Sequence, residues 1–265
     1  MQSVTTSQDG EILVLSVNNP PVNALSWHVR QGISDGVEQG LKDDSVKAIV
    51  IRCEGQTFIA GADITEFGKP PQGPDFNAVL NTIEMATKPV IAAIHGTALG
   101  GGLETTLVCH YRIAVPSAKL GVPEVKLGLL PGAGGTQRLP RLVGIEQAAV
   151  MTSLGEPISA QKALDTGLID KLAGEDSLAA DAVAFARECV AKGPRRTRDL
   201  PVKGDTAIIA KLEAENARKW KGFDAPYANL RCVAAAAENP NIEDGLKFER
   251  AEFMKLMMGS QSAAQ

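Results

Sequence analysis

The chain has 265 residues, of which 44% are hydrophobic and 22% are charged, as in an ordinary globular protein. This length suits one large domain or two small ones and is enough to bury a core without disulfide staples. The net charge of -4 argues against a nucleic-acid partner, because the phosphates of nucleic acids attract basic surfaces. No apolar run approaches the roughly 20 residues that span a bilayer, and the N-terminus lacks the features of a signal peptide.

The four cysteines and three histidines form no recognisable metal or disulfide pattern. The cysteines lie far apart in apolar surroundings and predict reduced, buried thiols rather than disulfides. No metal site is predicted. The cysteines are Cys53, Cys109, Cys189 and Cys232, and the histidines are His28, His95 and His110.

The first half of the chain has the pattern of a layered α/β protein. β-Branched segments bounded by polar turns predict strands. A four-residue hydrophobic step from Val29 to Leu41 predicts a helix over 26–42, and a second helix is expected over 101–109. The expected strands cover residues 11–17, 46–53, 89–94 and 110–115.

After residue 124 the pattern becomes mostly helical. Residues 193–204 are rich in proline, glycine and charge and predict a linker. We therefore expect a core over 1–192, that linker, and a helical C-terminal region over 205–265. Helices are expected over 134–142, 145–154, 159–166 and 176–191, with three more between 205 and 258.

Three short segments carry candidate chemistry, and the first is FIAGADI at 58–64. It follows the strand expected over 46–53, and its small residues would let a ligand approach the backbone closely. Such a loop can direct unpaired amide hydrogens at a substrate carbonyl. Taken alone, the segment is better explained as a tight strand-to-helix turn than as a ligand-binding loop.

The second segment is HGTALGGGLE at 95–104, where three glycines lead into a helix. Amides at a helix N-terminus carry partial positive charge and suit a developing oxyanion. Glu104 lies three residues after Gly101 and so shares its helical face, although a lone Glu there often only complements the helix dipole. No GK[ST] follows, and the spacing is not GxGxxG, which argues against a nucleotide loop.

The third segment is GVPEVKLGLLPGAGGTQR at 121–138, with Glu124 at an expected helix start. The neighbouring Leu127, Leu129 and Leu130 predict apolar surroundings, which would raise the pKa of a carboxyl group. Two carboxyl groups in different environments can divide the roles of acid and base.

Together, in this order and spacing, the three segments resemble the enoyl-CoA hydratase/isomerase (crotonase) superfamily. NPPVNALS at 19–26 and ISAQKALDTGLID at 158–170 extend the resemblance over residues 5–190. The resemblance implies a spiral of ββα turns followed by a helical C-terminal region. It also implies the following site: Glu104 and Glu124 as the acid/base pair, the Ala62 and Gly101 amides as donors to the thioester oxygen, and Ala60, Gly61 and Ile64 as the loop that cradles the adenine end of CoA.

The implied reaction is hydration of trans-2-enoyl-CoA to (3S)-3-hydroxyacyl-CoA in fatty acid β-oxidation, with isomerisation of 3-enoyl-CoA to trans-2-enoyl-CoA as a second activity. Two alternatives stay open. A dedicated Δ3,Δ2-enoyl-CoA isomerase needs one shuttling carboxylate, and a silent relative would only bind CoA or RNA. Coenzyme A is part of the substrate, so the resemblance implies no metal or redox cofactor. Relatives often have a CoA-binding lysine near Thr65 or Pro21, which is missing here; Lys69 and Lys88 are weaker candidates.

The segments 98–114 and 245–265 resemble the hydratase part of multifunctional β-oxidation enzymes, in which a 3-hydroxyacyl-CoA dehydrogenase portion follows. We expect a monomer, with a trimer as the alternative, in the cytoplasm of a bacterium or the peroxisome of a eukaryote. A helix over 242–258 is expected to pack over the hydratase core and help close the CoA site. Its predicted apolar stripe is Ile242, Leu246, Phe253 and Met257, with Phe248 on the opposite side.

Overall fold

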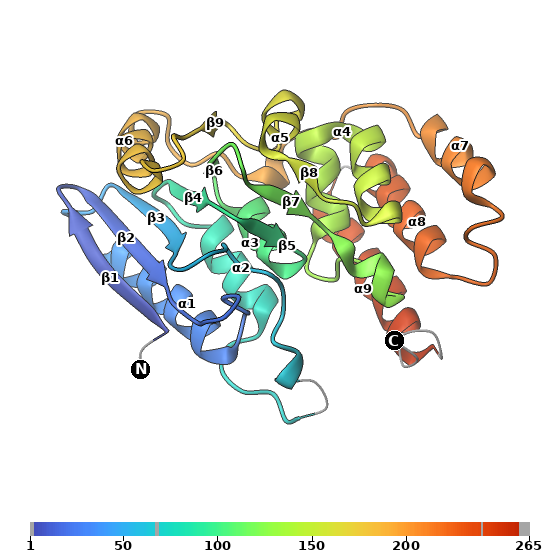
Figure 1. Ribbon diagram of the computed structural model, residues 1–265, viewed down its shortest axis with the longest axis horizontal. Helices are drawn as coiled ribbons and strands as arrows, with labels where there is room; N and C mark the ends of the chain where they lie inside the picture. Colours follow the sequence, from blue (N-terminus) through green and yellow to red (C-terminus); the bar gives the residue numbers. More distant parts are fainter. Residues whose placement is uncertain (1–2, 67–68, 240, 260–265) are drawn as a thin grey trace.

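A six-stranded sheet in the order β1-β2-β3-β4-β6-β9 organises the fold in the computed structural model, which describes residues 3–66, 69–239 and 241–259 (Figure 1). The hairpin β1–β2 is antiparallel, and every later pair in this sheet is parallel. The strands are β1 (Val4–Asp9), β2 (Ile12–Val17), β3 (Ala48–Cys53), β4 (Val90–Ile94), β6 (Tyr111–Ala114) and β9 (Lys171–Leu172).

A second, smaller sheet has the order β5-β7-β8 and is formed by β5 (Thr97–Leu99), β7 (Lys119–Gly121) and β8 (Ile158–Ser159). The chain alternates between the two sheets, from β4 to β5 and then from β6 to β7. A helix follows each of these strand pairs, so each turn adds one ββα unit. The predicted α/β spiral is therefore confirmed.

The helices cover the sheets and form the C-terminal region. They are α1 (Trp27–Lys42), α2 (Phe76–Glu84), α3 (Gly101–Val108), α4 (Gly135–Leu154), α5 (Ala160–Thr166), α6 (Leu178–Val190), α7 (Ala207–Asn216), α8 (Ala225–Glu238) and α9 (Ile242–Met258). Short 3₁₀ turns are η1 (Ile64–Glu66), η2 (Pro123–Leu127) and η3 (Thr197–Asp199). The two helices expected over 134–142 and 145–154 are joined as α4, which bends at Gly144 (φ 82°).

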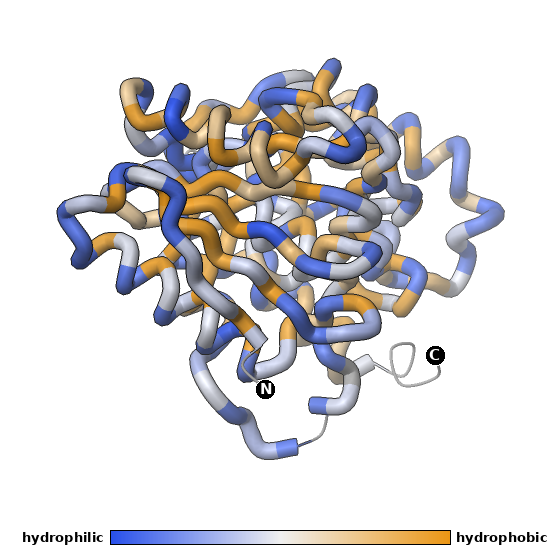
Figure 2. Tube along the Cα trace, turned by 60° about the vertical axis from the view of Figure 1, so that its left-hand side comes forward, coloured by the Kyte–Doolittle hydropathy of each residue, from blue (hydrophilic) through white to orange (hydrophobic). Residues whose placement is uncertain are grey.

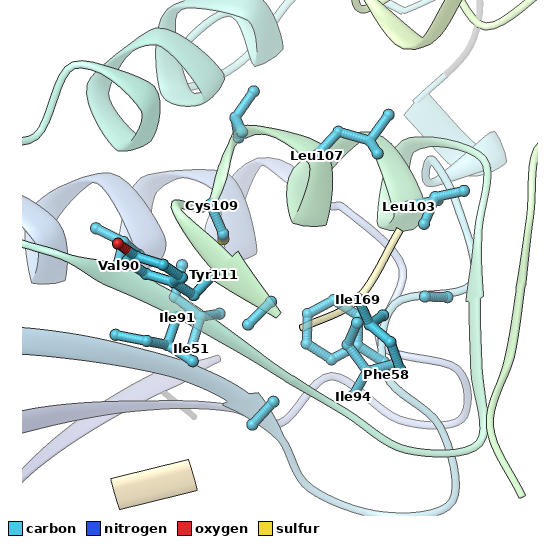
Figure 3. Packing of buried hydrophobic residues seen from close by; sticks show 14 of the residues in the cluster. Ile51, Phe58, Val90, Ile91, Ile94, Leu103, Leu107, Cys109, Tyr111 and Ile169 are labelled. Carbon is cyan, nitrogen blue, oxygen red and sulfur yellow. The ribbon is translucent and has the colours of Figure 1, made fainter. Parts of the chain in front are cut away.

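The large sheet is buried because its central strands are apolar on both faces. All residues of β2 and β4 are buried, as parallel strands covered on both sides require. These strands are continuous hydrophobic runs in Figure 2. Figure 3 draws part of the core, with side chains from β3, β4, β6 and α3. Seven residues of α3 are buried, so Glu104 on this helix is carried into the interior.

Helices α8 and α9 pack against α4 at the end of the molecule opposite the β1–β2 hairpin (Figure 1). The apolar stripe predicted for α9 is partly wrong. Its buried positions are Ile242, Gly245, Glu249, Glu252 and Leu256. Met257 is 49% exposed, and Phe248, expected on the opposite side, is exposed. The buried face is rotated because it includes Glu249 and Glu252, whose carboxylates have hydrogen-bonding partners in the protein.

The expected linker over 193–204 lies against the core in part, since Thr197 is buried and its hydroxyl donates a hydrogen bond to the carbonyl of Leu107. The division of the chain into core, linker and helical region stays a prediction. The four cysteines are buried and free, as expected. Among the described residues no helix is long and apolar enough to cross a membrane.

The NPPVNALS turn is fixed by the buried side chain of Asn23, which has φ 52°. Its Nδ2 donates to the carbonyls of Glu54 and Thr57 at 2.8 and 2.9 Å, and its Oδ1 accepts from the Asn19 amide at 2.8 Å. Just beyond this turn, the Leu25 amide donates to the Gly61 carbonyl at 3.0 Å. The turn therefore anchors the loop that contains FIAGADI.

Replacing Asn23 with alanine should lower the free energy of unfolding by about 2–4 kcal/mol, because three backbone groups, one of them buried and two part-buried, lose their partner and alanine disfavours a positive φ. Chemical denaturation measures the change. Asn23→Gly, which accepts the positive φ, should recover only the backbone part of the loss. Asn77→Ala at an exposed position is the control and should change stability by less than about 0.5 kcal/mol. Equal stabilities for Asn23→Ala and the control would contradict the anchoring role.

Candidate active site

The three segments singled out from the sequence meet at the N-terminal end of α3. The Leu99 amide donates to the Ile59 carbonyl at 3.1 Å, which joins the first segment to the second. The Gly100 amide donates to the Gly121 carbonyl at 3.0 Å, which joins the second to the third. Residues spread over about 80 positions of the sequence are thus brought to one place.

The glycines at 100 and 102 are required by close approach of other groups. Gly100 has φ 55°, and a Cβ there would lie 3.1 Å from Oε1 of Glu124. A Cβ on Gly102 would lie 1.8 Å from the Ile59 carbonyl oxygen. Side chains at these positions would separate the FIAGADI loop and Glu124 from the start of α3.

The amides of Ala62 and Gly101 are free to bind a ligand. Gly101 is the first residue of α3, where an amide has no intrahelical acceptor. Ala62 is exposed and follows Gly61, which lies against the Leu99 carbonyl. Among the described residues, neither amide donates a hydrogen bond to a protein acceptor. The site therefore offers two unpaired donors beside a helix N-terminus.

The rest of the FIAGADI loop is well connected to its surroundings. The Ala60 amide donates to the Val22 carbonyl at 3.2 Å, so of its backbone polar groups the carbonyl is the one left to a ligand. Gly61 has φ 116°. Ile64 begins η1, and its side chain lies outside the described residues. The predicted cradle for the adenine end of CoA stays a prediction.

Glu104 is buried, and its carboxylate accepts two backbone hydrogen bonds from the residues at the start of α4. The amides of Ala133 and Gly135 both donate to Oε1, at 2.8 and 2.9 Å. Burial raises the pKa of Glu104, while these two bonds and the nearby Arg138 act to lower it. The two backbone hydrogen bonds and Arg138 thus stabilise the charged form of Glu104.

Glu124 projects from η2 and lacks the two hydrogen bonds that Glu104 accepts from the start of α4. Its Oε2 is inaccessible to solvent and has no hydrogen-bond partner among the described residues. Burial raises the pKa of Glu124 well above its ordinary value, and Glu104 raises it further. The expected apolar surroundings are partly wrong: Leu130 is buried, but Leu127 is 55% exposed because η2 turns it outward. The neutral form of Glu124 is therefore favoured.

A third buried acid, Glu249 of α9, was missed by the sequence analysis. Its carboxylate accepts from the amides of Gly134 and Thr136 at 2.7 and 3.0 Å, and burial raises its pKa to about 8. The signal was the strict three-and-four spacing of 242, 245, 249, 252 and 256. Two charged residues inside that stripe concealed it.

A cavity of about 430 Å³ lies between α2, the start of α4 and α9, and of the three acids only Glu249 is in its lining. The lining also includes Leu80, Gly134, Leu246 and Arg250. Helix α9 thus packs over the core, as predicted, and forms one wall of a cavity that the third candidate segment also lines. That this wall helps to close a CoA site stays a prediction.

Of the two candidate lysines for CoA phosphates, Lys88 is otherwise engaged. Its Nζ donates to the carbonyls of Gly40 and Asp43 at 2.8 and 2.7 Å, at the end of α1. Lys69 remains a candidate, because it is exposed and lines a cavity of about 290 Å³ next to Thr65. No cluster that could hold a metal ion occurs among the described residues.

Comparison with known proteins agrees with this geometry. Residues 7–227 match the family model described as enoyl-CoA hydratase/isomerase. The chain is 43% identical to the peroxisomal bifunctional enzyme of Danio rerio over 258 residues, which is 95% of this chain but 35% of that protein. It is 42% identical to the probable enoyl-CoA hydratase of Bacillus subtilis (strain 168) over 208 residues, covering 76% of this chain and 81% of that one.

Among solved structures, a carnitinyl-CoA dehydratase from Mycobacterium avium 104 superposes with a TM-score of 0.75 at 27% identity. The match covers 99% of this chain and 95% of the dehydratase. The chain spans about a third of the length of the peroxisomal bifunctional enzymes that it matches.

Proposed function

Since the chain belongs to the enoyl-CoA hydratase/isomerase family, we propose that it hydrates trans-2-enoyl-CoA to (3S)-3-hydroxyacyl-CoA. The observation that carries this proposal is the pair of carboxyl groups, Glu104 and Glu124, in contrasting surroundings at one site. Hydration needs both a base that activates water and an acid that supplies a proton.

The two free amides suit the thioester. Attack of water at C3 of the enoyl group moves negative charge onto the thioester oxygen, giving an enolate-like state. The amides of Ala62 and Gly101 would donate to that oxygen, helped by the positive N-terminal end of α3. They are held by the backbone before the reaction begins, so little reorganisation opposes their effect.

The two carboxyl groups would divide the proton transfers. Glu104, whose charged form is stabilised by hydrogen bonds from Ala133 and Gly135, takes a proton from the attacking water, whose oxygen bonds to C3. Glu124, kept neutral by burial, gives its proton to C2. A proton passed from Glu104 back to Glu124 restores the resting state, so the cycle consumes only water and substrate.

A second candidate activity is isomerisation of 3-enoyl-CoA to trans-2-enoyl-CoA, which one carboxylate can perform by moving a proton between C4 and C2. Glu124 is the better placed for it, because its Oε2 is not held by a hydrogen bond among the described residues. The presence of Glu104 beside it favours hydration as the main reaction. The same carboxyl pair argues against a silent relative that only binds CoA.

The names of the relatives indicate a metabolic context for the proposed reaction. Their names include peroxisomal bifunctional enzymes and a glyoxysomal fatty acid β-oxidation multifunctional protein. We propose that this chain serves fatty acid β-oxidation and that, in a longer protein, a 3-hydroxyacyl-CoA dehydrogenase portion would consume its product. A monomer whose site is closed by its own α9 is preferred over a trimer, and a peroxisome over the cytoplasm if the source is eukaryotic.

Purified protein should hydrate crotonyl-CoA, seen as loss of the enoyl thioester absorbance. Glu104→Gln and Glu124→Gln should each lower kcat by about 10²–10⁴-fold, because each removes a proton-transfer group. Folding should survive in both, since a glutamine at 104 still accepts from the two amides. Isomerisation of a 3-enoyl-CoA should fall further in Glu124→Gln than in Glu104→Gln.

Glu146→Gln, at an exposed position of α4, is the matched control and should keep full activity. Equal loss of isomerisation in the two active-site variants would contradict the single-carboxylate shuttle. An inactive wild-type protein that still binds acyl-CoA would favour the silent relative.

Replacing Gly101 with proline tests the oxyanion role. Proline is tolerated at the first position of a helix and removes the amide hydrogen while adding a ring, so kcat should fall by about 10²–10³-fold while acyl-CoA affinity changes little. Gly101→Ala is the control for added bulk, because its Cβ would lie 3.0 Å from the flexible end of Leu25 and its amide is kept. If the folded proline variant turned over as fast as the alanine variant, the Gly101 amide would not be an oxyanion donor.

A further inference from the structure

Four successive amides at the start of α4 are divided between two carboxylates. In residues 133–136, the odd-numbered amides donate to Glu104 at 2.8 and 2.9 Å. The even-numbered amides donate to Glu249 at 2.7 and 3.0 Å. One short turn of backbone is thus held from one side by α3 and from the other by α9.

Glu249 is fixed in this position by more than its backbone contacts. The residue is buried, and the hydroxyl of Thr136 also donates to its Oε2. Gly245, one helical turn earlier on α9, packs so closely that a Cβ there would lie 2.1 Å from Oε1 of Gln137. Helix α9 is therefore seated tightly enough to hold the Glu249 carboxylate in place.

The charges around Glu249 come from four elements. Glu104 on α3 raises the pKa of Glu249, and Arg138 on α4 lowers it. Glu249 in turn raises the pKa of Glu124 on η2 and of Cys232 on α8. The three acids are therefore coupled, since ionising one makes it harder to ionise the others.

We propose, on the basis of the proposed function, that Glu249 is a positioning residue of the hydratase site: it holds the turn whose amides orient Glu104, and its charge state is coupled to those of Glu104 and Glu124. The C-terminal helix thereby becomes part of the catalytic apparatus although Glu249 contacts no reacting atom. A glutamate that only attaches α9 to α4 would affect stability but not the ionisation of the other two acids.

The test compares Glu249→Gln with Glu252→Gln. Glu252 is also buried on α9, but it pairs with Arg231 and Lys255, away from Glu104. In Glu249→Gln the midpoint for ionisation of Glu124, followed by ¹³C NMR of labelled glutamate, should fall by on the order of one pH unit, because a like charge that raises the pKa of Glu124 is removed. The alkaline limb of the pH profile of kcat/KM, which the proposed acid Glu124 sets, should move to lower pH for the same reason. Glu252→Gln should leave the midpoint and the profile in place.

An unchanged Glu124 midpoint in folded Glu249→Gln would overturn the inference, whatever the effect on thermal stability. If that variant does not fold, Thr136→Val decides instead. It removes the hydroxyl donor, favours neutral Glu249, and should also lower the Glu124 midpoint; no shift would again overturn the inference. The NMR readout does not need turnover, so an inactive wild-type protein would count against the proposed function alone.

Discussion

The interaction on which the site depends is the binding of the buried Glu104 carboxylate to the amides at the start of α4. A carboxylate placed on a helix as deeply buried as α3 would be expected to take up a proton and lose its use as a base. The Ala133 and Gly135 amides offset part of that desolvation, with help from Arg138. Glu124 lies close enough for the charge of Glu104 to raise its pKa, and the only backbone donor to its carboxyl group among the described residues is its own amide. The difference in backbone donors, rather than in residue type, separates the two acids.

Glycine makes this arrangement sterically possible. Gly102 lets α3 approach the Ile59 carbonyl, which brings the FIAGADI loop beside the helix N-terminus. Gly135 does the same for Glu104, because a Cβ there would lie 2.9 Å from its Oε1. Glycine-rich segments of this kind are often phosphate-binding loops. In this protein the glycines instead allow the backbone to pack closely against carboxylates. These contacts bring the free amides, the buried carboxyl groups and the wall formed by α9 to one site.

Much of the fold and half of the site could be predicted from the sequence. Apolar runs predicted the long strands, and a helical periodicity that includes Val29 and Ile33 predicted α1. The three candidate segments were found by their order and spacing. Strands β1, β5, β7, β8 and β9 were not predicted. The last four are only two or three residues long, which is too short to show a periodicity. Glu249 escaped for a different reason. A glutamate on a helix ordinarily faces water, and only the tertiary contact of α9 with α4 gives it amides to bind. Leu127 was misplaced because η2 turns through a 3₁₀ geometry that its neighbours do not reveal.

The account holds that Glu104 is the base and Glu124 the acid because the backbone stabilises the charge of the first more than that of the second. The most direct measurement is a ¹³C NMR titration of the wild-type protein with both glutamates assigned through their glutamine variants. Glu104 should lose its proton at a lower pH than Glu124, leaving Glu104 ionised and Glu124 protonated near neutral pH. The reverse order, or two carboxylates ionised together well below neutral pH, would contradict the account.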